Sequence, residues 1–116
     1  MRRAPVLREI VRQHAETAAF LWTVYDWSLL HPEENEDMDE ERLARLVERL
    51  EAHLDGVRVA GAEGLRIAEE RYAEYPEAGE LFVLRMLAAE KPILVAELDI
   101  EKVRAYLDAN VGDGLG

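Results

Sequence analysis

Residues 49–65, RLEAHLDGVRVAGAEGL, bring the residue types of a catalytic or phosphate-binding site close together. Glycines spaced along a loop can cradle a phosphate group, and Gly56 and Gly61 have the spacing of the phosphate loop GxxxxGK[ST]. Ala62 and Glu63, however, stand where that loop needs a lysine and a hydroxyl residue, and a glutamate would repel a phosphate. We therefore interpret these glycines as the junction between two helices.

The histidines are the other candidates for chemistry. His53 and Asp55 are two residues apart, so on a helix their side chains point about 160–200° away from each other and cannot form a general-base pair. His53 lies at the edge of an apolar stripe, which is typical of a half-buried structural histidine. His14 lies inside the apolar stripe of the first helix, between Ile10 and Leu21. We expect His14 to hydrogen-bond a partner in the core and to be structural.

Metal-binding and cofactor motifs are missing from the sequence. There is no cysteine, no HExxH, and no Glu-x-x-His at His14, His31 or His53. The sequence therefore predicts no catalytic residue, no metal ligand and no cofactor. One alternative stays open, a small helical enzyme or metal-binding protein that uses His14 or His53 with carboxylates from another helix.

The composition is that of one soluble globular domain, with 116 residues and a net charge of −11. Nucleic-acid binders and proteins of acidic lipid surfaces need a basic face, so we expect neither kind of partner. No apolar run approaches the ~20 residues of a membrane span, and the first residues do not resemble a secretory signal. We expect a cytoplasmic protein.

Helical spacing of apolar residues runs through nearly the whole chain. It predicts helices over residues 5–30, from about 38 to 57, over 65–75, over 80–90 and over 100–110, the last capped by Asp99. Asp37 with Glu40 fits a capping box for the second helix, and three residues around Val57–Val59 are too few for a hairpin. The fold class we predict is all-α, with four to five antiparallel helices in a bundle. The expected core residues are Leu21, Leu46, Leu50, Leu54, Tyr72, Leu84 and Leu87.

Two segments carry a resemblance to a known family: QHAETAAFLWTVYDW at 13–27 and RLEAHLDGVRVAG at 49–61. Here the chain resembles the N-terminal region of a family of bacterial HEAT-repeat-containing proteins of unassigned function. The resemblance implies the start of a helical solenoid that exposes a surface for protein binding. Some family members are encoded near type VI secretion genes, which hints at partners. The end, NVGDGLG, resembles the place where family members continue, so we expect residues 1–116 to be one helical domain at the N-terminal end of a longer chain.

The candidate partner surface has two parts. Phe20 and Trp27 lie far around the first helix from its apolar stripe, as in a helix that contacts a partner. In a solenoid the last apolar flank needs a neighbour, so we expect Val103, Leu107 and Val111 to be uncovered and to contact the next repeat or a second copy. The acidic outer face of the second helix should be polar and solvated, with Asp39, Glu40, Glu41, Glu48, Glu51 and Asp55. These features predict a non-catalytic protein-interaction or scaffold module.

Overall fold

The chain folds into five α-helices, which a computed structural model describes over residues 6–34 and 38–111. The helices are α1 (Val6–Leu30), α2 (Glu40–Arg58), α3 (Ala62–Glu74), α4 (Ala78–Ala88) and α5 (Ile100–Asn110). Two short 3-10 helices, η1 (Pro32–Glu34) and η2 (Val95–Glu97), lie in the longer connections. The described ranges contain no strand, and the all-α prediction is confirmed.

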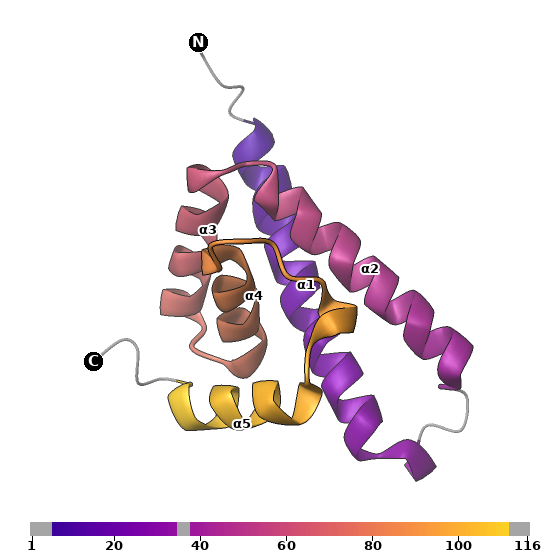
Figure 1. The fold of residues 1–116 in the computed structure, drawn as a ribbon. Coiled ribbons are helices and arrows are strands. Elements are labelled where there is room, and N and C mark those ends of the chain that lie inside the picture. The colour runs from indigo at the N-terminus through magenta and orange to yellow at the C-terminus, as the bar shows by residue number, and fades with distance from the viewer. Residues whose placement is uncertain (1–5, 35–37, 112–116) are drawn as a thin grey trace.

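The first four helices form two hairpins, and the fifth crosses them (Figure 1). α1 and α2 are the long pair and run antiparallel, while α3 and α4 form a shorter antiparallel pair beside them. The chain then passes in front of α4 through residues 89–99 and continues into α5, which lies across one end of the α3–α4 pair. The prediction of four to five antiparallel helices is therefore met by α1 to α4, and α5 crosses them.

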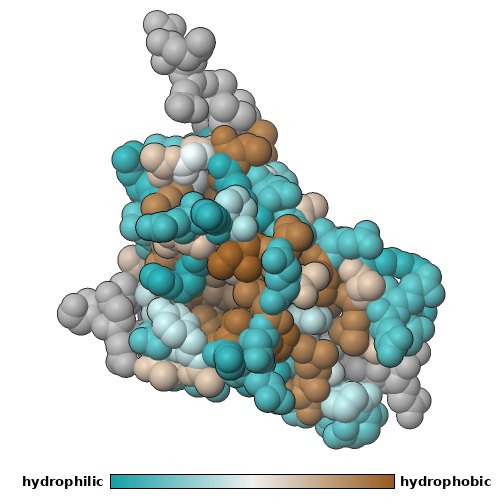
Figure 2. Space-filling model, viewed as in Figure 1, coloured by the Kyte–Doolittle hydropathy of each residue, from teal (hydrophilic) through white to brown (hydrophobic). Residues whose placement is uncertain are grey.

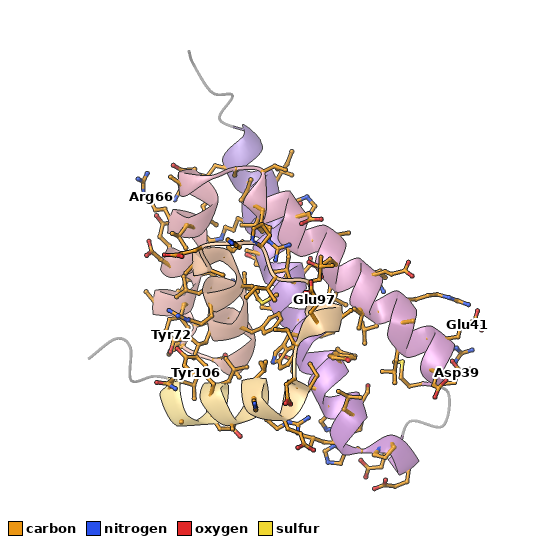
Figure 3. The ribbon with its side chains drawn as sticks, in the orientation of Figure 1. Asp39, Glu41, Arg66, Tyr72, Glu97 and Tyr106 are labelled. Carbon is orange, nitrogen blue, oxygen red and sulfur yellow. The ribbon has the colours of Figure 1, made fainter. Side chains whose placement is uncertain are left out.

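The start of α2 differs from the predicted capping box. Asp39 is the N-cap, and its side chain accepts a hydrogen bond of 2.9 Å from the backbone N–H of Arg42. Helix α2 begins at Glu40, so the prediction that Asp37 caps it is wrong, and Asp37 itself lies outside the described residues. Asp39 and Glu41 mark this end of the helix in Figure 3. The sequence offers several acidic residues in a row, and only helical geometry selects the one that caps.

The core lies where the two hairpins meet. Five of the expected core residues, Leu21, Leu46, Leu50, Leu54 and Tyr72, are buried, whereas Leu84 and Leu87 are partly buried and pack against the core. Trp22 is its largest member and stacks on Phe82, with ring centroids 4.2 Å apart and planes 10° from parallel. This contact joins α1 to α4 across the centre of the molecule.

Glu51 is an exception to the expected solvated face of α2. Its side chain is only 18% exposed, and it accepts hydrogen bonds from the backbone N–H of Val95 at 2.6 Å and from Arg58 at 2.9 Å. The prediction that Glu51 faces outward is therefore wrong. Residues 89–99 fold back over this part of α2, and the N–H of Val95 takes the Glu51 carboxylate as its acceptor. The other acidic residues expected on this face are exposed.

No helix in the described part of the chain combines the length and the apolar character needed to cross a membrane.

Candidate interaction site

His14 and His53 contact each other, although 39 residues separate them in the sequence. Their Nδ1 atoms are 2.9 Å apart and the ring planes are tilted by 48°. Two neutral imidazoles can form this bond when one Nδ1 carries a proton and donates while the other accepts. Both side chains are half-buried, and the partner of His14 is a histidine at the edge of the core. The pair joins α1 to α2.

Gly56 makes room for this pair. A Cβ atom at Gly56 would lie only 2.6–2.9 Å from three ring atoms of His14, closer than packed atoms can approach. The glycine is therefore explained by the close approach of a ring from α1 and not by phosphate binding. Gly64 has a similar role at the junction of α2 and α3, where a Cβ would lie 2.2 Å from the carbonyl oxygen of Val57.

The environment of His53 favours its neutral imidazole. Burial lowers the pKa of His53 from its ordinary value, and the neighbouring His14 and Arg49 lower it further. Among the described hydrogen bonds and ion pairs, none joins a carboxylate to either histidine. Within residues 6–34 and 38–111, no three histidine, aspartate or glutamate side chains gather as metal ligands would. The pair can share or release a proton, but the described residues give it no carboxylate to act with.

The outer face of α1 carries large exposed apolar side chains. Phe20 is 64% exposed, Trp27 45% and Leu30 50%, and Thr23 lies between them. Their spacing of three and four residues places them on one side of the helix, and we call these four residues the α1 stripe. Trp27 is held in place by His31, whose ring stacks on it at 4.5 Å and whose Nδ1 donates to its carbonyl oxygen.

A second apolar surface is concave. It is a groove of about 360 Å³ between α4, residues 89–98 and α5, and we call it the α4–α5 groove. Figure 2 shows hydrophobic side chains around this hollow, with hydrophilic ones on either side. Its buried floor includes Phe82 and Met86, and Ile93 and Tyr106 stand at its edges with 38% and 42% of their surfaces exposed. The position of Tyr106 on α5 is labelled in Figure 3.

The flank predicted to be uncovered is instead packed within the chain. Leu107 is only 2% exposed, and Val103 and Val111 are partly buried against the core. The prediction that these residues form an open flank is wrong. Helix α5 crosses α4, and its apolar side packs against α4 and the core. Val103 and Leu107 still line the α4–α5 groove, so they belong to a concave surface and not to the exposed flank that we expected. The predicted continuation after Val111 falls on residues 112–116, outside the described residues.

Ion pairs fix the helices that carry these surfaces. Arg71 of α3 pairs with Glu16 of α1 at 3.3 Å and with Glu80 of α4 at 3.4 Å. Burial raises the pKa of Glu80, while Arg71 beside it opposes that rise. Arg104 of α5 donates to Asp26 of α1 at 2.7 Å and sets the position of α5 across the bundle.

Comparison of the chain with protein-family models, with curated proteins and with solved structures gives no match.

Sequence reasoning missed the histidine pair and the groove for different reasons. The pair had a signal, because Gly56 lies three residues after His53 and so on the same face of α2. A glycine inside a helix beside an apolar stripe indicates the close approach of a bulky group. The groove had no comparable signal, since its walls come from α4, α5 and the irregular segment that joins them.

Proposed function

We propose that this chain is a non-catalytic protein-interaction module, and that the α1 stripe is its contact surface. The observation that carries the proposal is the exposure of Phe20 and Trp27, two large aromatic side chains seven residues apart on one helix face. Tryptophan is enriched among the residues that dominate binding energy in protein interfaces, and charged residues are depleted there. Both residues were expected on a partner surface from the sequence.

Rigidity supports the same proposal. A side chain that is ordered before binding loses less entropy when a partner covers it. Trp27 is already restrained by the stacked ring of His31, and α1 is restrained by Arg71 and by the core contact of Trp22. The stripe is thus an ordered apolar surface on a helix that the rest of the fold holds in place.

The resemblance to HEAT-repeat proteins supplies two candidate occupants, which are part of this proposal: the next repeat of a longer chain and a second copy. The alternative of a small enzyme or metal-binding protein would depend on His14 and His53. These residues hydrogen-bond each other, which favours a structural role for them and supports the non-catalytic proposal.

The test is capture of a partner by the immobilised chain. The stripe variant carries Phe20→Ser and Trp27→Ser, and the matched control carries Val59→Ser and Leu94→Ser, which are also exposed apolar residues. We expect a partner that the wild-type chain and the control retain and that the stripe variant loses. Removing one central aromatic side chain should reduce the binding free energy by at least about 2 kcal/mol, which corresponds to about thirtyfold weaker binding. Equal retention by all three proteins would contradict the proposal.

Self-association needs a separate measurement. Light scattering over a concentration series should show whether the wild-type chain dimerises, and Phe20→Glu should abolish any dimer built on the stripe. A dimer that persists in Phe20→Glu would show that a different surface makes the contact, against the proposed role of the stripe.

A further inference from the structure

The α4–α5 groove carries positive charge on a strongly negative protein. Arg85 and Lys102 stand exposed among its lining residues, and none of the described residues that line it is acidic. The chain as a whole has a net charge of −11. A positive site on such a surface favours a partner whose contacting groups are negatively charged.

Neither of these two cations pairs with a carboxylate among the described ion pairs. The described ion pairs occupy Arg8, Arg12, Arg45, Arg58, Arg66, Arg71 and Arg104. Arg85 instead lies over the ring of Tyr106, with its guanidinium carbon 5.9 Å from the ring centroid, and Lys102 makes no described ion pair. The two cations therefore remain available to carboxylates of a bound molecule.

The shape and walls of the groove restrict what can bind. Its volume of about 360 Å³ is near the lower end of ligand cavities, which fits a few inserted side chains rather than a whole segment. Since the described residues form no strand, a partner there has no sheet edge to extend. An apolar groove between helices is the kind of surface on which an amphipathic helix docks, inserting side chains spaced three and four residues apart.

We propose that the α4–α5 groove binds the apolar face of an amphipathic helix whose flanking residues are acidic. Apolar side chains of that helix contact the accessible apolar lining, Ile93, Leu98 and Val103, and its carboxylates pair with Arg85 and Lys102. This site is separate from the α1 stripe and would give the module a second contact.

The experiment uses two labelled peptides and measures fluorescence anisotropy in about 0.15 M salt. Both are 18-residue alanine-based helices with Leu, Phe and Leu at positions i, i+4 and i+7; the acidic probe has four flanking glutamates and the basic probe four flanking lysines. The net charge of the protein alone favours the basic probe. At this salt concentration the Debye length is about 8 Å, so the contacts at Arg85 and Lys102 decide the preference. We expect the acidic probe to bind at least tenfold more tightly.

Variants locate the site. Ile93→Glu introduces a carboxylate at the exposed edge of the groove and should abolish binding, whereas Val59→Glu, a matched change at an exposed position that does not line it, should leave binding unchanged. Arg85→Gln and Lys102→Gln should each weaken the acidic probe by about two- to fivefold, the range for an exposed ion pair. Circular dichroism checks that each variant is folded.

Four results would overturn the proposal: equal or tighter binding of the basic probe, no binding of the acidic probe at millimolar protein, unchanged binding in Ile93→Glu, or self-association that Ile93→Glu abolishes, which would make a second copy the occupant. The stripe variant, Phe20→Ser with Trp27→Ser, should bind the acidic probe as the wild-type chain does. Failure of the groove proposal is thereby distinguishable from failure of the proposed function.

Discussion

Replacing Gly56 with alanine should destabilise the fold, and removing the ring of His14 should reverse the sign of that effect. Alanine is the better helix former by up to about 1 kcal/mol, so Gly56→Ala would stabilise α2 if space allowed. A Cβ at this position, however, would lie 2.6–2.9 Å from three ring atoms of His14. The ring must move, and it then gives up its hydrogen bond with His53.

The expected magnitude follows from these opposing effects. Overpacking of this kind costs about 1–3 kcal/mol, which outweighs the gain in helix propensity. We therefore expect Gly56→Ala to lower the free energy of unfolding by on the order of 1 kcal/mol. In the His14→Ala background the obstruction is gone, and the same change should raise that free energy by up to about 1 kcal/mol. The coupling between the two sites is then about 1–3 kcal/mol.

The assay is urea denaturation followed by circular dichroism for the four proteins of the cycle. Similar denaturant slopes in all four would show that the native and unfolded states are comparable. Gly64→Ala is the matched control, because its Cβ would meet the backbone carbonyl of Val57 at 2.2 Å and should destabilise both backgrounds equally. If Gly56→Ala stabilised the wild-type chain as much as it stabilises His14→Ala, the packing account of this glycine would be refuted.

Three further predictions concern the same helices. Burial, His14 and Arg49 lower the pKa of His53, so the unfolded chain binds more protons than the folded one near that pH. The free energy of unfolding should therefore fall as the pH drops through about 6.5. Urea titrations should show a smaller fall in His53→Gln, and an equal fall would contradict the role of His53. Glu51→Ala should cost about 1–3 kcal/mol in the same assay because the N–H of Val95 loses its acceptor, whereas exposed Glu48→Ala should change stability by under about 0.5 kcal/mol. Metal analysis of protein purified without chelator should find well under one zinc per chain, because the histidine pair supplies two ligands where a structural site needs about four. One zinc per chain would contradict the prediction that the pair binds no metal.

Local spacing predicted the helices because each amphipathic helix repeats its own pattern. The stripe of Leu46, Leu50 and Leu54 identifies the buried face of α2 without knowledge of any other helix. Spacing does not say which neighbour covers a face. Leu107 was correctly placed on an apolar side of its helix, but the path of residues 89–99 decides that α4 covers it. The error at Glu51 has the same origin, since its partner Val95 lies 44 residues away.

Charge shows the same division between local and long-range information. The net charge of −11, from which we expect neither nucleic acid nor acidic lipid as a partner, is a sum that does not depend on how the chain folds. The net charge does not show which cationic side chains form ion pairs within the fold. Arg71 and Arg104 become bridges between helices, so their charges are neutralised where they stand. Arg85 and Lys102 line one apolar groove, in which none of the described lining residues is acidic, because α5 crosses α4 at that point. The positive charge of this groove on an acidic protein is thus a property of helix packing, and it appears only when the helices are placed.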